Sequence, residues 1–226
     1  MRIDILTLFP EMFAPLYASI PARAQTSGKA KIELHDLRDY APAPHRQVDD
    51  TPFGGGPGMV LKPEPLAKAI RSICAEEEVP VKVIYMSPQG VPLTQKLAEE
   101  LSRLPRLLLV CGHYEGIDER IIAKYIDMEV SIGDYVLSNG ELGAMVLSDA
   151  VIRLLDGVIS SESAAQESFS TGILDHPQYT KPAVFEDMPV PEVLLSGNHK
   201  LIETWRQEQA LANTRRKRPD LLTHNV

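Results

Sequence analysis

The densest group of reactive side chains in the sequence is the run CGHYEGIDER at residues 111–120. Its thiol and imidazole, Cys111 and His113, could form a nucleophile pair, and its carboxylates could form the acid–base pair of a glycosidase. However, residues two apart at the end of a strand rarely hydrogen-bond correctly, and Asp118 and Glu119 also suit the cap and first turn of a helix. We therefore favour helix capping over nucleophilic catalysis for this run.

A second unusual stretch is SIGDYVLSNGE, residues 131–141, which begins like a strand and is broken twice, at a Gly-Asp pair and again at Asn139-Gly140. Either a hairpin or a backbone shaped around a ligand would explain the double break. The apolar segment between the breaks, Tyr135 to Leu137, is short for a second strand, which favours the ligand.

The glycine-rich run TPFGGGPGM, residues 51–59, could also bind a ligand. It lacks the spacing of a P-loop and of a dinucleotide-binding turn, so a phosphate cradle of either kind is not expected. Asp49 and Asp50 precede it and a helical pattern follows. A binding loop and a plain hinge explain it about equally well.

Three charged residues accompany a serine-rich stretch at residues 157–172, which has the composition of a linker. Arg153 precedes this stretch, Glu167 lies within it and Asp175 lies just past it. Each alone resembles an ordinary surface residue, but mobile catalytic segments concentrate beside flexible linkers. We therefore keep all of them as catalytic candidates.

The elements that must position these residues alternate between strand and helix. Apolar periodicity predicts strands over 3–8, 31–34, 81–86 and 107–111, and helices opening at Pro10, covering 65–74, starting near Thr94 and Asp118, and covering 141–155 and 199–214. This alternation predicts an α/β fold with a mostly parallel sheet, whose ligands bind beyond the carboxyl ends of the strands. The loops expected at that edge are 87–90, which should end the third strand, 112–116 and 133–140.

Composition narrows the class of protein. The 226 residues are 44% hydrophobic and 24% charged, with only Cys74 and Cys111 as cysteines, so neither a disulfide framework nor a zinc site is expected. The sequence shows no signal peptide and no membrane-spanning stretch, and we expect a cytoplasmic protein. The net charge of −8 opposes nucleic-acid binding, but residues 196–226 hold six Lys or Arg against three Asp or Glu.

Taken together, the sequence resembles the bacterial tRNA (guanine-N1)-methyltransferase family, TrmD. The resemblance covers nearly the whole chain through ordered segments: LFPEMF (8–13), VDDTPFGGGPGM (48–59), YMSPQG (85–90), CGHYEGIDER (111–120), SIGDYVLSNGEL (131–142), DAVIRLLDGV (149–158), ILDHPQYTKP (173–182), VPEVLLSGNH (190–199) and TRRKRPDLL (214–222).

This resemblance implies a SPOUT-type trefoil-knotted α/β domain over residues 1–158, a flexible linker over 159–171 and a small helical, tRNA-binding C-terminal domain over 172–226. It also implies a homodimer with its sites at the subunit interface. S-adenosylmethionine would bind in the knot, lined by Tyr85, Met86, Ser87, Pro88, Gly112, Tyr114, Glu115, Ile132, Gly133, Asp134, Tyr135, Val136, Leu137 and Gly140. A need for Mg²⁺ stays open, and no protein ligands for a metal are predicted.

The substrate implied by the resemblance is the guanosine at position 37 of tRNA, taken out of its stack. Arg153 matches the arginine that holds charge on O6, and the general base is Glu167 or Asp175, with glutamate standing where the family usually has aspartate. His113 replaces a common arginine. Asn139 replaces a common glycine and is expected to take a left-handed turn, as asparagine can.

The same features would also fit a non-catalytic RNA-binding or structural dimer that has kept the fold, or an enzyme of this fold that methylates another RNA or a small molecule. The non-catalytic dimer would follow if Glu167 and Asn139 marked a lost activity. The basic C-terminal region and the intact glycine-rich loop favour a tRNA methyltransferase by resemblance.

Overall fold

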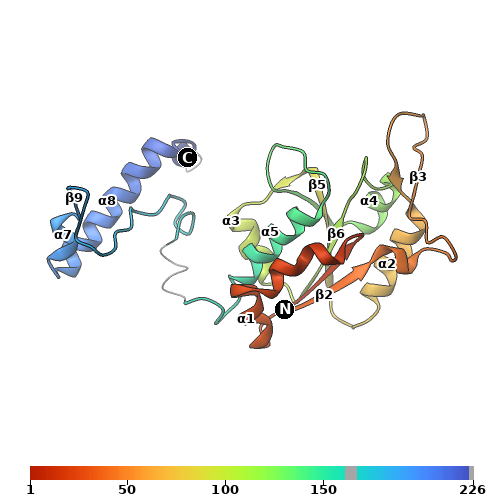
Figure 1. The fold of residues 1–226 in the computed structure, drawn as a ribbon, viewed down its shortest axis with the longest axis horizontal. Coiled ribbons are helices and arrows are strands. Elements are labelled where there is room, and N and C mark those ends of the chain that lie inside the picture. The colour runs from red at the N-terminus through yellow and green to blue at the C-terminus, as the bar shows by residue number, and fades with distance from the viewer. Residues whose placement is uncertain (161–166, 224–226) are drawn as a thin grey trace. The chain divides into compact units, whose positions relative to one another are not determined.

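The computed structural model describes residues 1–160 and 167–223, so part of the expected linker and the last residues of the chain lie outside the described residues. The chain divides into a first compact unit, Met1–Ile159, and a second, Ser160–Val226. Each unit is described by itself below (Figure 1).

The first unit is built on a five-stranded sheet in the order β2-β1-β6-β5-β7, and every pairing in it is parallel. The strands are β1 (Arg2–Thr7), β2 (Lys31–Asp36), β5 (Val81–Pro92), β6 (Arg106–Cys111) and β7 (Met128–Ser131). All residues of β6 are buried, as expected for a continuous apolar run in the middle of a parallel sheet. The predicted α/β class with a mostly parallel sheet is confirmed.

Helices cover both faces of this sheet (Figure 1). On one face the 3₁₀-helix η1 (Pro10–Tyr17) packs with α1 (Ser19–Thr26), α3 (Gln95–Ser102) and α5 (Glu141–Ile152). On the other lie the short η2 (Leu37–Tyr40), α2 (Pro63–Cys74) and α4 (Glu119–Tyr125). Side chains alternate between the layers: Ile3 and Ile5 of β1 join the first core, and Leu6 joins the second.

The helices begin at residues that the sequence marks for this purpose. Asp118 accepts a hydrogen bond from the amide of Arg120 at 2.9 Å, and a further hydrogen bond from the Arg120 side chain lowers the pKa of its carboxyl group. The predicted cap of α4 is therefore confirmed. Thr94 caps α3 by accepting from the amide of Leu97 at 3.2 Å.

Two predicted boundaries were wrong. The strand expected to end at Met86 continues to Pro92, because Gly90 lies so close to β7 that a Cβ there would be 2.3 Å from the amide nitrogen of Val130. The turn residues instead make an irregularity, in which the β5–β7 register shifts between Met86 and Val91. The helix expected to reach residue 155 ends at Ile152.

A buried ion cluster lies within the first unit. The carboxylate of Asp4, on β1, accepts from Nε of the fully buried Arg106 at 2.7 Å and lies 2.8 Å from Nε2 of His35. Burial alone would raise the pKa of Asp4, but its hydrogen bonds with His35, Arg106 and Arg2 outweigh burial and lower it. The charge of Arg106 is thus neutralised at the sheet.

The second unit contains the hairpin of β8 (Val184–Phe185) and β9 (Met188–Pro189), followed by α7 (Glu192–Leu195), α8 (His199–Lys217) and α9 (Asp220–Thr223). Asn198 caps α8, and the predicted helix over 199–214 is confirmed and extends to Lys217. The ring centroid of Trp205 lies 6.3 Å from that of His176 and 6.2 Å from that of Tyr179. None of the helices in the described part of the chain is long and apolar enough to cross a membrane.

Candidate functional site

A cavity of about 460 Å³ lies at the carboxyl edge of the sheet in the first unit. The loops predicted to meet at that edge do meet there, because parallel strands end on the same side. The cavity is lined by Tyr85, Met86, Ser87, Pro88, Gln89, Gly112, His113, Tyr114, Glu115, Gly116, Ile117, Glu119, Ile122, Glu129, Val130, Ser131, Ile132, Gly133, Tyr135, Val136, Leu137, Ser138, Asn139, Gly140 and Gly143.

Every residue predicted from the resemblance to hold the donor lines this cavity except Asp134, which is exposed beside it. The predicted donor residues did not include the other lining residues, Gln89, His113, Gly116, Ile117, Glu119, Ile122, Glu129, Val130, Ser131, Ser138, Asn139 and Gly143. Glu129 belongs to β7 (Met128–Ser131). The sequence pattern indicated a strand only from Ser131 onward, so Glu129 was not expected at the edge of the sheet.

Glycines at the cavity bring backbone segments close together. A Cβ on Gly112 would lie 2.7 Å from the hydroxyl oxygen of Tyr85, and one on Gly140 would lie 2.9 Å from Cα of Cys111. Gly133 has a φ of +152°, and a Cβ there would meet the ring of Tyr135 at 2.4 Å. Side chains at these positions would fill or deform the cavity.

The prediction for Asn139 was wrong. Asn139 is not among the residues with positive φ, and Gly140 has a φ of −82° as the residue that caps α5. Asn139 instead forms an antiparallel bridge with His113, and the amide of Gly140 donates to the carbonyl of Gly112 at 2.9 Å. The second break in 131–141 therefore serves close packing against the 111–113 segment. The residue that does take a left-handed conformation here is Tyr114, with a φ of +58°.

The cavity is acidic. Glu115, Glu119 and Glu129 line it, and none of its lining residues among those that the structure describes is Lys or Arg. Burial, with a further contribution from the charge of Glu129, raises the pKa of Tyr85 to about 12, so this phenol stays neutral and polar at the cavity wall. Such a site favours a cationic ligand over an anionic one.

Cys111 does not have the properties of a nucleophile. Its side chain is buried, and burial together with the charge of Glu141 raises the pKa of its thiol well above the usual value. A thiolate is the reactive form, so the Cys–His pair considered from the sequence is disfavoured. The ring of His113 instead packs against Phe9 and Tyr114, with centroids 5.0 Å away in both cases.

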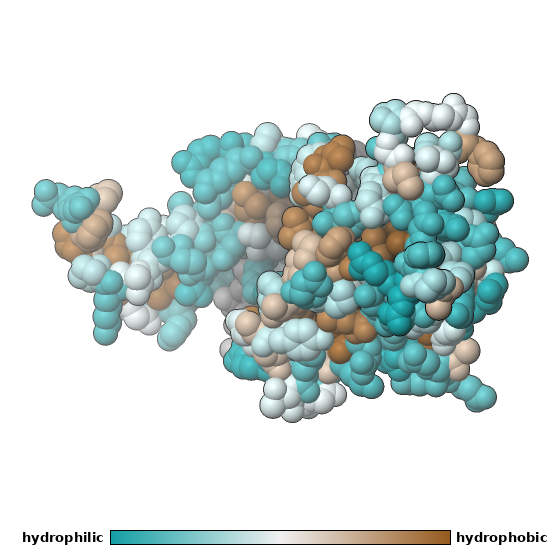
Figure 2. Space-filling model, turned by 45° about the vertical axis from the view of Figure 1, so that its right-hand side comes forward, coloured by the Kyte–Doolittle hydropathy of each residue, from teal (hydrophilic) through white to brown (hydrophobic). Residues whose placement is uncertain are grey.

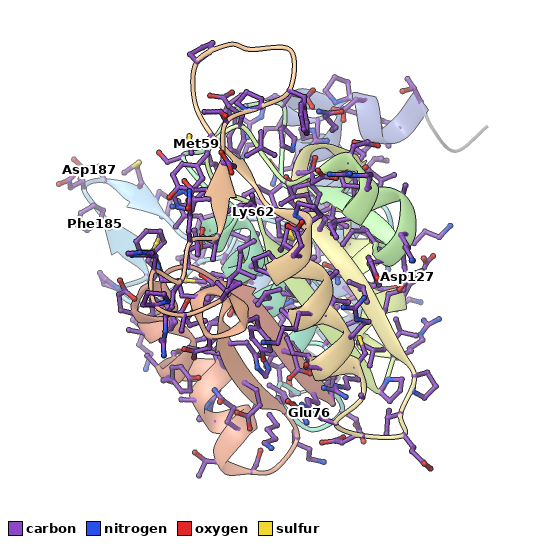
Figure 3. All side chains as sticks on the ribbon, turned by 90° about the vertical axis from the view of Figure 1, so that its right-hand side faces the viewer. Met59, Lys62, Glu76, Asp127, Phe185 and Asp187 are labelled. Carbon is purple, nitrogen blue, oxygen red and sulfur yellow. The ribbon has the colours of Figure 1, made fainter. Side chains whose placement is uncertain are left out.

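The glycine-rich loop is attached to the wall of this cavity. It connects β3 (Asp49–Asp50) with β4 (Val60–Leu61), and the carbonyl of Met59 accepts from the amide of Glu115 at 3.0 Å. A Cβ on Gly58 would lie 2.3 Å from a carboxylate oxygen of Glu115, so the backbone lies directly on that side chain. Figure 3 shows Met59 near the base of the loop, which projects away from the sheet.

The catalytic candidates belong to different units. Arg153 is the C-cap residue of α5 and is half-buried. Glu167 and Asp175 both line a cavity of about 210 Å³ in the second unit, together with Arg206 of α8. The Asp175 carboxylate accepts from the amide of His176 at 2.6 Å and from the side-chain amide of Gln178 at 3.0 Å.

Metal ligands do not gather in either cavity. Within residues 1–160 and 167–223, no group of His, Cys, Asp and Glu side chains is arranged to hold a metal ion.

Comparison with known proteins identifies the group to which the sequence is related. A family model described as tRNA (guanine-1)-methyltransferase, TrmD, matches residues 1–224. The chain belongs to the TrmD family. TrmD relatives named tRNA (guanine-N(1)-)-methyltransferase include the protein of Chloroflexus aggregans, 56% identical over 223 residues, which span 98% of this chain and 88% of that one.

Two more TrmD proteins with the same name show similar agreement. That of Ruminiclostridium cellulolyticum is 54% identical over 223 residues, covering 98% of this chain and 96% of its own. That of Macrococcus caseolyticus is 53% identical over 224 residues, covering 99% and 92%. The predicted family is confirmed.

Proposed function

We propose that this protein transfers a methyl group from S-adenosylmethionine to N1 of the guanosine at position 37 of tRNA. The observation that carries the proposal is the TrmD match over residues 1–224, and the relatives named above share this reaction class in their names. The acidic, glycine-lined cavity of the first unit supports it independently.

The residues of the cavity fit the proposed donor. Its volume of about 460 Å³ lies within the range of small-molecule sites. Gly112, Gly133 and Gly140 leave room that any side chain would fill, and Glu115 and Glu129 offer negative charge to a sulfonium. When bound, the donor supplies an electrophilic methyl group. The protein residues orient the donor and exclude water from it.

Guanine N1 carries a proton and becomes a good nucleophile only when that proton leaves. A carboxylate is the proposed base, and the guanidinium of Arg153 is proposed to hold the negative charge that then develops on O6. We favour Glu167 as the base, because it stands where the family usually has aspartate, and Asp175 is the alternative.

A homodimer with its sites at the interface is part of the proposal. Leu142 and Val146, on α5, are 45% and 47% exposed although α5 is otherwise a core helix. Asp149 and Arg153 follow on the same face at helical spacing, so the apolar stripe leads to the proposed catalytic arginine. A second copy covering this stripe would bring its own residues to Arg153.

The trefoil knot and the tRNA-binding role of the second unit are likewise proposals. The knot is supported by the packing of residues 139–140 against 112–113. The tRNA role is supported by Arg215, Arg216 and Lys217 in the last turn of α8, since phosphate binding requires such charges. A tRNA substrate also implies the cytoplasmic location expected from the sequence. Adding a chelator to the methyl-transfer assay would show whether the reaction needs Mg²⁺.

The deciding experiment compares methyl transfer to a tRNA transcript carrying guanosine at position 37 with transfer to one in which that base is replaced. We expect transfer only to the first, and equal transfer to both contradicts the proposal. Glu167→Gln should abolish turnover while S-adenosylmethionine still binds. If Glu167→Gln stays active and Asp175→Asn does not, the base is Asp175.

Calorimetry with S-adenosylmethionine separates this function from a non-catalytic dimer of the same fold. A methyltransferase should release or absorb heat with a defined stoichiometry as the cavity fills. A protein that has lost its chemistry together with its donor site should show no binding heat.

A further inference from the structure

The glycine-rich loop presents an aromatic ring to solvent at its tip. Phe53 is 100% exposed, more than any other large hydrophobic side chain in the described part of the chain. A fully exposed phenylalanine contributes no hydrophobic stabilisation to the folded state, because its ring stays in water. The ring of Phe53 is therefore available to contact another molecule.

The backbone holds Phe53 in a defined turn. The amide of Gly55 donates to the carbonyl of Pro52 at 3.3 Å, and Gly54 has a φ of +90°. A positive φ at the third position is what a type II turn requires, and it places Phe53 at the second position, on the outside of the bend. The ring is thus presented by a closed turn.

The loop carries this ring beside the donor cavity. From Phe53 to Met59 the chain can span at most about 20 Å, and Met59 is hydrogen-bonded to Glu115 of the cavity wall. Figure 1 shows the loop beyond β3 projecting from the first unit, and in the space-filling view it forms a pale arch above a hydrophilic surface (Figure 2). A nucleotide near one bound at the cavity lies within this reach.

The chemistry of the loop selects a nucleobase as the partner. Between Arg46 and Lys62 the sequence has no Lys or Arg, whereas Asp49 and Asp50 lie at the loop base, so the loop does not attract phosphates. A Cβ on Gly54, Gly55 or Gly56 would meet nothing within 4 Å. The residues that follow Phe53 therefore leave free space around the loop tip. Protein interfaces bury contiguous apolar patches, whereas a single ring suffices to stack on any base.

We infer that Phe53 stacks on an unpaired base of the RNA within a few nucleotides of the target guanosine, and so positions the substrate strand at the cavity. The inference rests on the proposed function. Stacking of this kind holds the backbone next to the extruded guanosine, while the reacting groups lie elsewhere. Phe53 is a positioning residue in this scheme.

The first test is a set of substitutions at the tip. Phe53→Ala should lower kcat/KM for tRNA about tenfold through KM, whereas Phe53→Tyr and Phe53→Trp should retain most of the activity because they keep a ring. Binding of S-adenosylmethionine, followed by calorimetry, should be unchanged in all of them. Tyr17→Ala is the matched control and should leave kcat/KM unchanged, since Tyr17 is a 51% exposed ring on η1 of the first unit.

The second test locates the base. Full-length tRNAs joined from synthetic halves would carry one abasic nucleotide at a time through the anticodon loop, with guanosine kept at position 37. At one position, removing the base should lower kcat/KM of the wild-type protein about tenfold. The same abasic tRNA should cause no further decrease in kcat/KM for Phe53→Ala, because the stacking contact is already missing.

The outcomes separate the inference from the function on which it rests. If the wild type methylates guanosine 37 and Phe53→Ala does so equally well, or if no abasic position removes the effect of Phe53→Ala, the stacking inference is wrong and the proposed function stands. If Phe53→Ala instead changes the dimer mass in light scattering, the ring contacts a second copy, which also overturns it. If the wild type shows no transfer, both fail.

Discussion

Gly140 and Cys111 lie in backbone contact, so close that a Cβ on Gly140 would be 2.9 Å both from Cα of Cys111 and from the amide nitrogen of Gly112. Neither neighbour is a side-chain tip that could rotate away. The start of α5 and the end of β6 are thereby fixed against each other at the cavity of the first unit, and the contact depends on the missing side chain of Gly140.

Gly140→Ala should therefore lower the free energy of unfolding by about 2 kcal/mol, as overpacking does, and weaken S-adenosylmethionine binding. Gly143→Ala is the matched control on the same helix, because its Cβ would meet only the side chain of Met86, whose terminal methyl lies nearest at 3.1 Å. We expect the control to unfold at the same or a higher denaturant concentration. Equal destabilisation of both would contradict a specific role for the Gly140 contact.

The buried phenol of Tyr85 predicts a loss of stability in alkali. Its pKa is raised to about 12, so it is protonated in the folded chain where an unfolded tyrosine, near 10, has already ionised. The contribution of Tyr85 to stability is therefore constant below about pH 9 and falls by about 3 kcal/mol as the pH rises to 12. Denaturant unfolding at pH 9 and pH 11.5 would show this loss in the wild type and a smaller one in Tyr85→Phe.

The ion pair of Asp4 with Arg106 predicts non-additive mutations. Asp4→Ala removes the nearest carboxylate from a fully buried guanidinium and should destabilise the protein by about 3–5 kcal/mol. Adding Arg106→Met should recover part of this loss, because no buried charge remains uncompensated. If the double variant is less stable than Asp4→Ala, packing of Arg106 outweighs its charge.

The Asp4–Arg106 pair also determines how the free energy of unfolding changes as the pH falls. Because the pKa of Asp4 is lowered by its partners, its contribution is present above the unfolded value near 4 and is lost as the pH falls through the folded one. Between about pH 5 and pH 3 the wild type should therefore lose stability more steeply than Asp4→Ala with Arg106→Met. Parallel curves for the two proteins would show that Asp4 does not carry the effect.

The exposed stripe of α5 predicts how the proposed dimer is broken. Leu142→Glu or Val146→Glu would bury a charge at the interface and should give a monomer in light scattering, with loss of methyl transfer. Leu201→Glu, on α8 at 54% exposure, is the control and should remain dimeric. Monomers that keep full activity would show that each site is complete within one chain.

The sequence predicted those features that depend on local pattern. The apolar run at 107–111 has the composition of a buried strand, and Asp118 followed by a periodic helix has the pattern of a cap. The meeting of the cavity loops followed from parallel topology. Together these predicted which loops meet at the sheet edge, whereas the individual residues expected to hold the donor came from the family resemblance.

The features that were missed depend on contacts distant in sequence. Ser87 to Gly90 have turn composition, yet pairing with β7 keeps them in the strand. Asn139 tolerates a left-handed turn, but its bridge to His113 sets another conformation. Arg106 lies just before the strand predicted over 107–111, and its burial depends on Asp4 and on the carbonyl of Ile73, which are both distant along the chain. The exposed tip at Phe53 had no signal beyond its glycines.

Among the described residues, all those that line the cavity of the first unit lie between Tyr85 and Gly143 in the sequence. One uninterrupted stretch of chain therefore encodes the whole chamber, while the glycine-rich loop and the second unit are encoded before and after it. If the proposed roles hold, substitutions in those outer parts would change which RNA is accepted without touching the residues that hold the methyl donor.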